Sequence, residues 1–350
     1  MTSHRCLLVF RSNAPERRPS LAVALEKAGF AVDCLAVPYD APRRGMPAIF
    51  GHKPSAASYD LVVVSEYLLA FGLCLRLMFA RRPRLAAVAF NQSTRLVRTG
   101  IGPVDWLLNR IWRRLDAVLV HSEDEARMFA EVHAIPRDRF VFSHWGYDLP
   151  AFDVQAVAIP AEPYVTMIGR NNRDLTSFVG AVERAGVKGV LITSEYMTAE
   201  LKGSVPDSVQ LLVDRSMEEC LAYVAGSFAH LVLVKDASRG AGHISAVSAM
   251  LLAKPQIFSD VAPIAEYLAD DVNGLAVPPA DPEAAAAAIV RLRDDPALAA
   301  RLGESGRAFA LAWLGDAMAT QRIADFCVAA ADRKPLPRFT DWRSLLSRRR

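Results

Sequence analysis

Residues 230–259 bring together features that a protein needs to bind an anionic group. An apolar run, His230–Val234, predicts a buried strand, and a polar glycine-bearing loop, Lys235–Gly242, leads into a helix-forming segment, Ile244–Leu252. The first N–H groups of a helix lack an intrahelical partner and carry partial positive charge. Gly240 and Gly242 let the backbone approach a ligand without a Cβ clash. The stretch therefore predicts an anion-binding site, with an ordinary strand–loop–helix turn as the alternative.

Further polar side chains follow predicted strands elsewhere in the chain. The carboxyl ends of parallel strands face the ligand crevice of such a sheet, so side chains there are candidates for binding. One polar loop, Gly169–Arg173, follows the strand Tyr164–Ile168, and Asn91, Gln92 and Arg95 follow the strand Leu85–Phe90. Within residues 230–259, Ser245 can cap the helix and also offer a hydroxyl group.

Composition limits the class of protein. The chain has 350 residues, 52% of them apolar, which suits two domains of ordinary size. Five cysteines are scattered singly in apolar runs, as expected for free thiols in a reducing compartment. The chain contains no CxxC and no HExxH, so we expect no metal site. Met1–Arg11 already has a strand pattern and no run of eighteen apolar residues occurs, so we expect a cytoplasmic protein without a signal peptide or spanning helix.

The net charge of +3 is unevenly distributed. Arginines cluster at Arg43–Arg44, Arg81–Arg84, Arg110–Arg114 and Arg348–Arg350. Each cluster is either a solvated surface or part of a binding site. No nucleic-acid motif accompanies the arginines and aromatic residues are not interleaved with them, so nucleic acid is not an expected partner.

Strand and helix patterns alternate twice along the chain. Residues 149–162 separate the two sets and read as a linker, because they contain two prolines and no clear period. Two such sets predict an α/β protein with two doubly wound parallel-sheet domains facing a cleft. The first loop lacks GxGxxG, which disfavours a dinucleotide site. The predicted strands are Cys6–Phe10, Ala31–Val37, Leu61–Val64, Leu85–Phe90, Ala117–Val120, Arg139–Ser143, Tyr164–Ile168, Val187–Thr193, Val209–Val213, His230–Val234 and Gln256–Ser259.

Three segments have the amphipathic or apolar character that also suits a membrane surface. In Pro103–Leu115, Trp106, Leu107, Ile111, Trp112 and Leu115 are expected on one face and the arginines on the other. Such a helix packs on the sheet or lies at an anionic membrane. Tyr67–Phe79 is expected to be a buried helix, with a membrane-facing helix as the alternative. The basic tail, Asp332–Arg350, is either a flexible end or a membrane contact.

Three segments carry recognisable motifs. VLVHSEDEARMFAEVHAIPRDRFVFSHWGYD, at the end of the first half, has a Ser-x-x-Glu helix start and a Gly-x-Asp exit. MIGRNNRDLTSFVGAV has a Gly-Arg loop at the start of the second half, and NGLAVPPADPEAAAAAIVRLRDDPALAARLGESGR lies near the end. In order and spacing, over about residues 117–310, these segments resemble retaining glycosyltransferases of the GT-B fold, of glycosyltransferase family 4 or a near relative. The first domain resembles that family only in outline.

The resemblance implies transfer of a sugar from a nucleotide-sugar to an acceptor with retention of configuration. Arg170 matches the Gly-Arg arginine and Arg173 stands near the second phosphate-binding cation, and guanidinium groups suit phosphate oxygens. Asn171 and Asn172 are candidates for sugar hydroxyls. The expected catalytic residues are His243, Arg170 and Arg173. The expected donor-binding residues are Gly169, Arg170, Asn171, Asn172, Arg173, Lys235, Gly240, Gly242, His243, Ile244, Ser245 and Ser248.

One feature departs from the family. Its members usually carry two glutamates eight positions apart, which contact the donor sugar and the nucleotide ribose. Aligning Lys254-Pro255 with the family's Lys-Pro places Gly240 and Ser248 at those positions. Gly242-His243-Ile244-Ser245 resembles a Gly-Gln-Ile-Ser variant of the loop. Ser248 could still bond a ribose hydroxyl, and His243 could face the donor sugar or diphosphate.

The sequence as a whole thus predicts a two-domain GT-B hexosyl- or other glycosyltransferase. The expected domains are residues 1–155 for the acceptor, 156–315 for the nucleotide-sugar, and 316–350 for a return helix and basic tail. The resemblance implies a UDP- or GDP-linked donor and no other cofactor. The acceptor is expected to be a glycan, lipid or small molecule that binds near Asn91, Gln92 and Arg95. The inner face of the membrane is an alternative location. A catalytically silent sugar-nucleotide-binding protein is the alternative function, and a periplasmic ligand-binding protein is a third class, disfavoured by the expected lack of a signal peptide.

Overall fold

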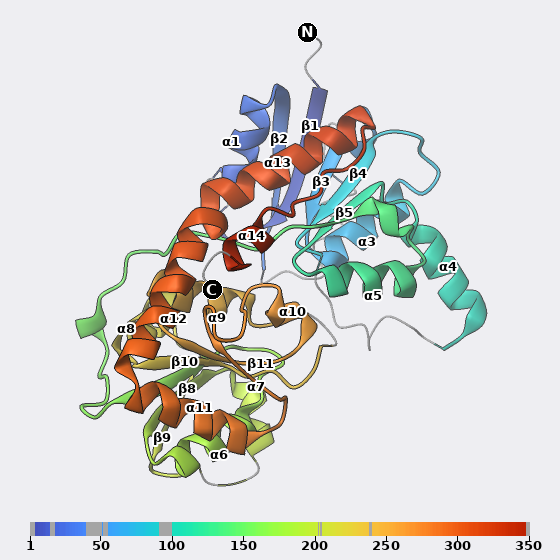
Figure 1. Ribbon diagram of the computed structural model, residues 1–350. Helices are drawn as coiled ribbons and strands as arrows, with labels where there is room; N and C mark the ends of the chain where they lie inside the picture. Colours follow the sequence, from blue (N-terminus) through green and yellow to red (C-terminus); the bar gives the residue numbers. More distant parts are fainter. Residues whose placement is uncertain are drawn as a thin grey trace. The chain divides into compact units, whose positions relative to one another are not determined.

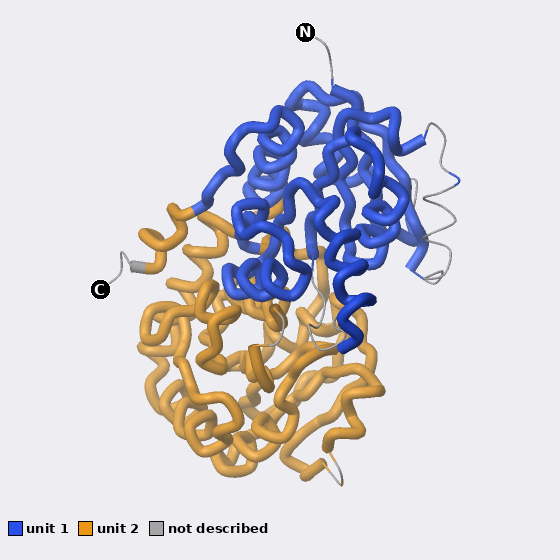
Figure 2. Tube along the Cα trace, turned by 90° about the vertical axis from the view of Figure 1, so that its right-hand side faces the viewer, with its two compact units in different colours: residues 1–144, 317–339 blue, residues 145–316, 340–350 orange. Residues whose placement is uncertain are grey.

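The computed structural model describes residues 4–14, 18–39, 51, 55–90, 100–201, 203, 205–237 and 240–347. Contacts along the backbone group the chain into two units, coloured separately in Figure 2. Unit 1 comprises residues 1–144 and 317–339, and unit 2 comprises residues 145–316 and 340–350. Residues 317–339 therefore belong to the first unit although they follow the second unit in the sequence.

Unit 1 is built on a six-stranded parallel sheet with the order β2-β1-β3-β4-β5-β6. The central strands β3 and β5 are almost wholly buried, as expected for a parallel sheet covered on both faces. The order reverses between β1 and β3, which creates a crevice at their carboxyl ends. The strands are β1 (His4–Arg11), β2 (Phe30–Val37), β3 (Leu61–Ser65), β4 (Arg84–Val88), β5 (Ala117–Val120) and β6 (Phe140–Phe142).

Helices cover both faces of this sheet (Figure 1). On one face, α1 (Ser20–Lys27) and α13 (Asp316–Asp332) pack against alternate strand residues such as Leu8 and Val63. On the other face, α3 (Tyr67–Arg76), α4 (Gly102–Trp112) and α5 (Glu123–His133) pack against the intervening residues, including Val62 and Val64. This alternation places successive strand side chains in opposite layers of the core.

Unit 2 has a second six-stranded parallel sheet, with the order β12-β11-β10-β7-β8-β9. The chain proceeds from β7 outward through β8 and β9, then returns to the other side of β7 to add β10, β11 and β12. This is the doubly wound Rossmann order, and its switch point lies between β7 and β10. The strands are β7 (Tyr164–Ile168), β8 (Lys188–Thr193), β9 (Val209–Val213), β10 (Ala229–Val232), β11 (Gln256–Ser259) and β12 (Leu275–Val277).

The helices of unit 2 again form two layers. On one face lie α6 (Leu175–Ala185) and α11 (Pro282–Asp294), and on the other lie α8 (Met217–Gly226) and α9 (His243–Leu251). The remaining α-helices are α7 (Glu195–Thr198), α10 (Ala262–Ala265), α12 (Pro296–Phe309) and α14 (Trp342–Ser347). Short 3-10 turns occupy Ala56–Ser58, Arg137–Arg139, Val154–Ala156 and Ala199–Leu201, and a π-helical turn occupies Ala310–Leu314.

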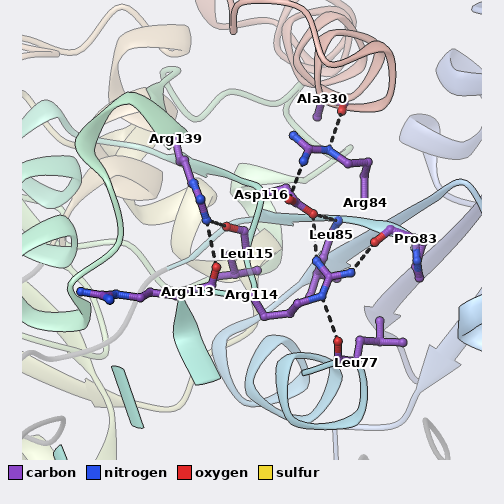
Figure 3. A network of polar contacts seen from close by, with 10 residues as sticks. All are labelled: Leu77, Pro83, Arg84, Leu85, Arg113, Arg114, Leu115, Asp116, Arg139 and Ala330. Atoms are coloured by element: carbon purple, nitrogen blue, oxygen red, sulfur yellow. Dashed lines mark hydrogen bonds and ion pairs between the residues drawn. The ribbon is translucent and has the colours of Figure 1, made fainter. Parts of the chain in front are cut away.

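Two of the arginine clusters contribute to a polar network in unit 1 (Figure 3). The carboxylate of Asp116, just before β5, accepts hydrogen bonds from Arg84 Nη1 at 2.6 Å and Arg114 Nη1 at 2.9 Å. It also accepts one from the Leu85 N–H at 2.8 Å. Arg84 Nε reaches Ala330 O of α13 at 3.2 Å. Arg84 and Arg114 therefore join elements of unit 1, whereas Arg81, Arg82 and Arg110 are exposed.

The structure corrects the expected faces of α4. Ile111, Trp112 and Leu115 are buried, but Trp106 and Leu107 are exposed. At 100° per residue Trp106 lies closer to Arg110 and Arg113 than to Trp112, so grouping it with the core residues was wrong. The buried face packs among rings, with the centroid of Trp112 4.7 Å from that of Tyr67 and the two ring planes tilted by 42°. The apolar residues of α4 therefore divide between the core and the solvent.

The other two segments with membrane character contribute to the core of the protein. α3 buries Leu69, Leu73 and Cys74, as the preferred reading of Tyr67–Phe79 predicted. The helix ends at Arg76, however, and Phe79 beyond it is exposed. In the basic tail, Trp342 and Leu346 of α14 are buried, so their apolar side chains are not exposed. Among the described residues, no helix has both the length and the apolar character needed to span a bilayer.

Candidate functional site

The switch point of the unit 2 sheet brings together the two polar loops identified in the sequence. The loop after β7 is Gly169–Asp174, and the loop after β10 leads to the N-terminus of α9. Arg173 forms an antiparallel bridge with Val234, and the Asp174 N–H donates to Leu233 O at 3.1 Å. Loops at a switch point diverge and leave room for a ligand. The predicted donor-binding residues of both loops therefore lie at one edge of one sheet.

Arg173 turns back into its own loop. Its side chain is buried, with Nε donating to Ile168 O at 3.0 Å and Nη1 donating to Asn171 O at 3.1 Å. A Cβ on Gly169 would lie 2.3 Å from Arg173 Nε, so only glycine leaves space for this arrangement. The guanidinium thus fixes the shape of the loop after β7.

Arg173 also connects this loop to α9. Its Nη2 donates to Ser245 Oγ at 3.3 Å, and Ser245 Oγ donates to Gly242 O at 3.0 Å. The buried guanidinium places positive charge beside a helix N-terminus, which already carries partial positive charge. Its field contributes to the lowered pKa of the buried His230, which burial and Arg173 together bring to about 3. The buried guanidinium and the helix N-terminus therefore both contribute positive potential at this edge of the sheet.

Gly242 shapes the start of α9. It is the N-cap residue, with φ of 99°, and no side chain among the described residues caps the helix. A Cβ at Gly242 would lie 2.8 Å from Val232 Cγ1 and 2.9 Å from Ile264 Cδ1. Glycine therefore satisfies both the left-handed backbone and the tight packing. The N–H groups of the first turn are directed at the loop region, as an anion site requires.

His243 is buried at the first position of α9. Its ring stacks on Tyr267 with centroids 4.4 Å apart, and Nε2 lies 3.1 Å from Pro263 O. Because a carbonyl oxygen only accepts, this contact places a proton on Nε2. These contacts orient the imidazole and help to hold the helix start against the segment that carries Pro263. The exposed side chain of this turn is Ile244.

The exposed cation of the site is Arg170. Its Nη2 makes one hydrogen bond within the described chain, to Arg215 O at 3.1 Å. The backbone carbonyl of Arg170 accepts from Ser194 Oγ at 3.1 Å and from the Tyr196 hydroxyl. The carbonyl contacts fix the Arg170 backbone while its guanidinium stays exposed to solvent. Ser194 and Tyr196 lie after β8, and the sequence analysis did not single them out.

Three other predicted donor-binding residues line the two loops. Asn172 has φ of 50°, and its Nδ2 donates to Asp236 O at 2.8 Å. The side chain of Asn171 accepts a hydrogen bond from the Tyr196 hydroxyl. Lys235 pairs with Glu200, both of them partly exposed. Each of these side chains contacts a neighbouring group in this structure. The Asn172 amide and the Lys235 ammonium keep further N–H donors beyond those contacts.

At the two positions where the family carries glutamates, Gly240 and Ser248 are buried. Ser248 Oγ donates to Ile244 O at 2.7 Å and lies 2.5 Å from the hydroxyl of Tyr147. Burial raises the pKa of Tyr147, so the phenol stays protonated at neutral pH. Tyr147 was not among the predicted site residues, although its Gly-x-Asp segment was noted. Its contact with Ser248 adds a second hydroxyl beside the ribose position that the resemblance implies.

The predicted acceptor-side residues Asn91, Gln92 and Arg95 lie outside the described residues. At the switch point of unit 1, Arg11 ends β1 and Glu66 follows β3. Glu66 has φ of 99° and caps α3 by accepting from the N–H groups of Leu68 and Leu69. Arg11 lies 3.5 Å from the Glu66 carboxylate. The crevice of unit 1 therefore carries a charged pair that the sequence analysis missed, because the two residues are far apart in the chain.

Comparisons with known proteins agree with this architecture. Residues 198–309 match the family of glycosyl transferases group 1. No curated protein matches the sequence. Sucrose-phosphate synthase from Thermosynechococcus elongatus is similar at 19% identity and a TM-score of 0.67, over 91% of this chain and 97% of that one. A glycosyltransferase from Rickettsia africae is similar at 11% identity and a TM-score of 0.67, over 94% and 99%.

A third similar structure contains a nucleotide. It is the Anabaena protein HepE in complex with UDP and glucose, with 14% identity and a TM-score of 0.66, over 93% of this chain and all of that one. At these identities the likeness concerns the fold. The chain has the GT-B fold, with two Rossmann-like parallel sheets flanked by helices. Together with the family match in unit 2, the fold supports a glycosyltransferase.

Proposed function

We propose that this protein is a retaining glycosyltransferase that transfers a sugar from a UDP- or GDP-linked donor to a glycan, lipid or small-molecule acceptor. One observation carries the proposal: Arg173 and the uncapped N-terminus of α9 meet at the switch point of the unit 2 sheet. That edge lies in the unit that contains the family match. HepE, which is similar in fold, was solved with UDP-glucose, and this supports a nucleotide-sugar as donor.

Sugar transfer from a nucleotide-sugar requires the protein mainly to stabilise the leaving diphosphate. In the proposed complex, the first N–H groups of α9 donate to phosphate oxygens, and the exposed guanidinium of Arg170 adds a charge-assisted contact. Arg173 holds the loop after β7 and the start of α9 in place, and its buried guanidinium adds positive potential at the site. Donors arranged before the reaction need no reorganisation when charge develops on the leaving group.

The remaining predicted residues are assigned supporting roles. Asn171 and Asn172 form hydrogen bonds with sugar hydroxyls, and Lys235 leaves Glu200 to pair with a phosphate. The buried His243 orients the start of α9 through its contacts with Pro263 and Tyr267. Ser248 with Tyr147 takes the ribose hydroxyls in place of a carboxylate. The acceptor binds to unit 1, with Asn91, Gln92 and Arg95 as contacts. Neutral hydroxyls bond a ribose less strongly than a carboxylate does, so we expect weaker donor binding than in relatives with the glutamate pair.

A catalytically silent sugar-nucleotide-binding protein is the second candidate. The observation that favours it is that Gly240 and Ser248 are not acidic, and that Ser248 Oγ already bonds to Ile244 O and lies against Tyr147. Such a protein would bind the donor at the same edge of the unit 2 sheet. It would lack the contacts that distinguish the transition state from the bound donor.

The first test measures the melting temperature of the purified protein with UDP, GDP and a panel of their sugar derivatives. A ligand that binds only the folded state must raise the melting temperature. Arg170→Ala should weaken binding of the stabilising nucleotide about tenfold or more, because a charge-assisted hydrogen bond contributes about 1.5–3 kcal/mol. Arg307→Ala, which removes an exposed arginine from α12, should leave the binding unchanged.

Turnover separates the two candidates. Donor hydrolysis or transfer by the wild type, lost in Arg170→Ala, supports the enzyme and gives the anomeric configuration of the product. Binding without turnover across donors and acceptors supports the silent protein. If no nucleotide or nucleotide-sugar raises the melting temperature, both candidates are wrong.

A further inference from the structure

Unit 1 carries an exposed apolar surface that nucleotide-sugar binding does not explain. It comprises Phe79, just after α3, and Trp106, Leu107, Arg110 and Arg113 on the solvent side of α4, and is called the α3–α4 surface below. Phe79 is 84% exposed, Trp106 65% and Leu107 46%. Single exposed apolar side chains are ordinary, whereas several large ones gathered on one face indicate a partner.

A groove connects the two parts of this surface. Its volume is about 340 Å³, and it is lined by Met78, Trp106, Asn109, Arg110, Arg113 and Arg114. Arg114 Nε donates to Leu77 O at 2.9 Å, so the end of α3 is bound to the end of α4. Trp106, Arg110 and Arg113 follow the i, i+4, i+7 spacing that places side chains on one helix face. The groove thus has an aromatic wall and a row of guanidinium groups.

Positive charge on the surface exceeds negative charge. Arg110 makes no hydrogen bond or ion pair with any residue that the structure describes. Arg113 Nε donates a hydrogen bond to Ala134 O at 3.1 Å, and the charge of Arg114 is neutralised by its ion pair with Asp116 (Figure 3). Asp105 is the acidic residue of α4, and it accepts from the Gly100 N–H at 3.2 Å. Arg81 and Arg82, next to Phe79 in the chain, are also exposed.

We propose that the α3–α4 surface docks on an anionic phospholipid bilayer, with a lipid phosphate in the groove. Exposed Trp and Phe side chains near basic residues match the boundary between headgroups and acyl chains. Arginines beside them match the negative potential of anionic lipids. The groove has cations and an amide for phosphate oxygens, and an aromatic wall for the glycerol region. The inference does not depend on the proposed function, since it rests on residues of unit 1 alone.

A second copy of this chain is a weaker candidate for the same surface. A two-fold interface would bring Arg110 and Arg113 of one copy close to the same residues of the other, and like charges repel. The buried tail helix α14 does not provide an equivalent surface, because its Trp342 and Leu346 are covered. The charge and exposure of the α3–α4 surface therefore favour lipid.

The test uses the full chain and sedimentation with vesicles of phosphatidylcholine, with and without phosphatidylglycerol. The wild type should sediment with the anionic vesicles at low salt and be released by salt. Each basic residue near an anionic surface contributes about a fivefold change in binding, so Arg110→Glu with Arg113→Glu should weaken it about twentyfold or more. Trp106→Ser should weaken binding to the same vesicles without changing its salt dependence.

Two controls make the outcome specific. Arg307→Glu reverses an exposed arginine of unit 2 and should leave vesicle binding unchanged. The surface variants should also keep the melting temperature of the wild type, which shows that they fold.

Several outcomes would overturn the inference. One is that the wild type binds neutral and anionic vesicles equally. Another is that the variants bind anionic vesicles as well as the wild type does. A third is release from vesicles by inorganic phosphate at matched ionic strength, which would indicate a site for free phosphate. Self-association that Trp106→Ser abolishes, without any vesicle binding, would instead indicate a second copy.

Discussion

At the scale of single residues, the candidate site depends on a glycine whose backbone and surroundings exclude any other residue. Gly242 combines φ of 99° with a Cβ position 2.8 Å from Val232 Cγ1. Gly242→Ala should therefore lower the free energy of unfolding by about 2–5 kcal/mol, because a left-handed alanine costs about 1–2 kcal/mol and overpacking adds about 1–3 kcal/mol. It should also abolish nucleotide binding, since the first turn of α9 must shift. Denaturant unfolding and the nucleotide-induced melting shift measure the two effects.

Gly186→Ala is the matched control. Gly186 ends α6 with φ of 61°, and its Cβ position has no atom within 4 Å. The variant should lose only the backbone cost of about 1–2 kcal/mol and should bind nucleotide normally. Equal losses of stability in the two variants, or normal binding by Gly242→Ala, would show that close packing at Gly242 does not shape the site.

Sequence reasoning located the residues of this site but not the directions of their side chains. Arg173 was found from its place after a strand, yet nothing local indicates that its guanidinium folds inward to Ile168 O and Ser245 Oγ. Those acceptors are brought near by the pairing of β7 with β10. Tyr147 was missed for the same reason, because its contact with Ser248 joins residues about a hundred positions apart.

At the scale of secondary-structure elements, the apolar runs predicted most strands closely. The strands Tyr164–Ile168, Val209–Val213 and Gln256–Ser259 were predicted with the observed bounds. The spacing of apolar residues along the helices predicted less well which side of each helix is buried. The direction of Trp106 depends on which side of α4 meets the ring cluster of Tyr67, Phe90 and Trp112, and local sequence does not specify that.

The network around Asp116 joins several elements at the amino ends of β4 and β5. Asp116→Ala should lower the free energy of unfolding by about 2–3 kcal/mol, because it removes charge-assisted hydrogen bonds from Arg84 and Arg114 and one from the Leu85 N–H. Nucleotide binding in unit 2 should be unaffected. Denaturant unfolding checks the stability, and the nucleotide-induced melting shift checks the binding.

Asp294→Ala provides the comparison for an exposed pair. Asp294 pairs with Arg293 on α11, and both side chains are largely exposed. Water and salt screen such a pair, so no measurable loss of stability is expected. If Asp116→Ala behaved like Asp294→Ala, the network would be a surface feature without a structural role.

At the scale of the whole molecule, the fold persists where the sequence has changed. The structures similar to this chain share its two sheets at 11–19% identity. A doubly wound sheet needs buried strands and right-handed crossovers, which many apolar sequences satisfy. The family match instead lies in residues 198–309 of unit 2, where the proposed donor would constrain particular residues.

Each unit also contains a buried histidine whose pKa is lowered, which predicts an acid-sensitive molecule. Burial lowers the pKa of His121 in unit 1, and burial with Arg173 lowers the pKa of His230 in unit 2 to about 3. An unfolded histidine has a pKa of about 6.5, so above that pH neither state binds the proton and stability is complete. As the pH falls from about 6.5 towards about 3, the unfolded chain takes up protons that the folded chain does not. The free energy of unfolding should then fall by about 1.4 kcal/mol per pH unit for His230.

The measurement is the free energy of unfolding between about pH 7 and about pH 4, for the wild type and for His230→Asn. His230→Asn loses the contact between His230 Nδ1 and Thr166 Oγ1. It also removes the buried Nε2 of His230, which has no hydrogen-bond partner among the described residues. For the variant, the free energy of unfolding should change less steeply with pH, by the amount that corresponds to about one proton fewer taken up on unfolding. This holds whatever the stability of the variant at neutral pH. An unchanged slope would mean that His230 takes up its proton as readily in the folded state as in the unfolded chain, and that burial and Arg173 do not lower its pKa.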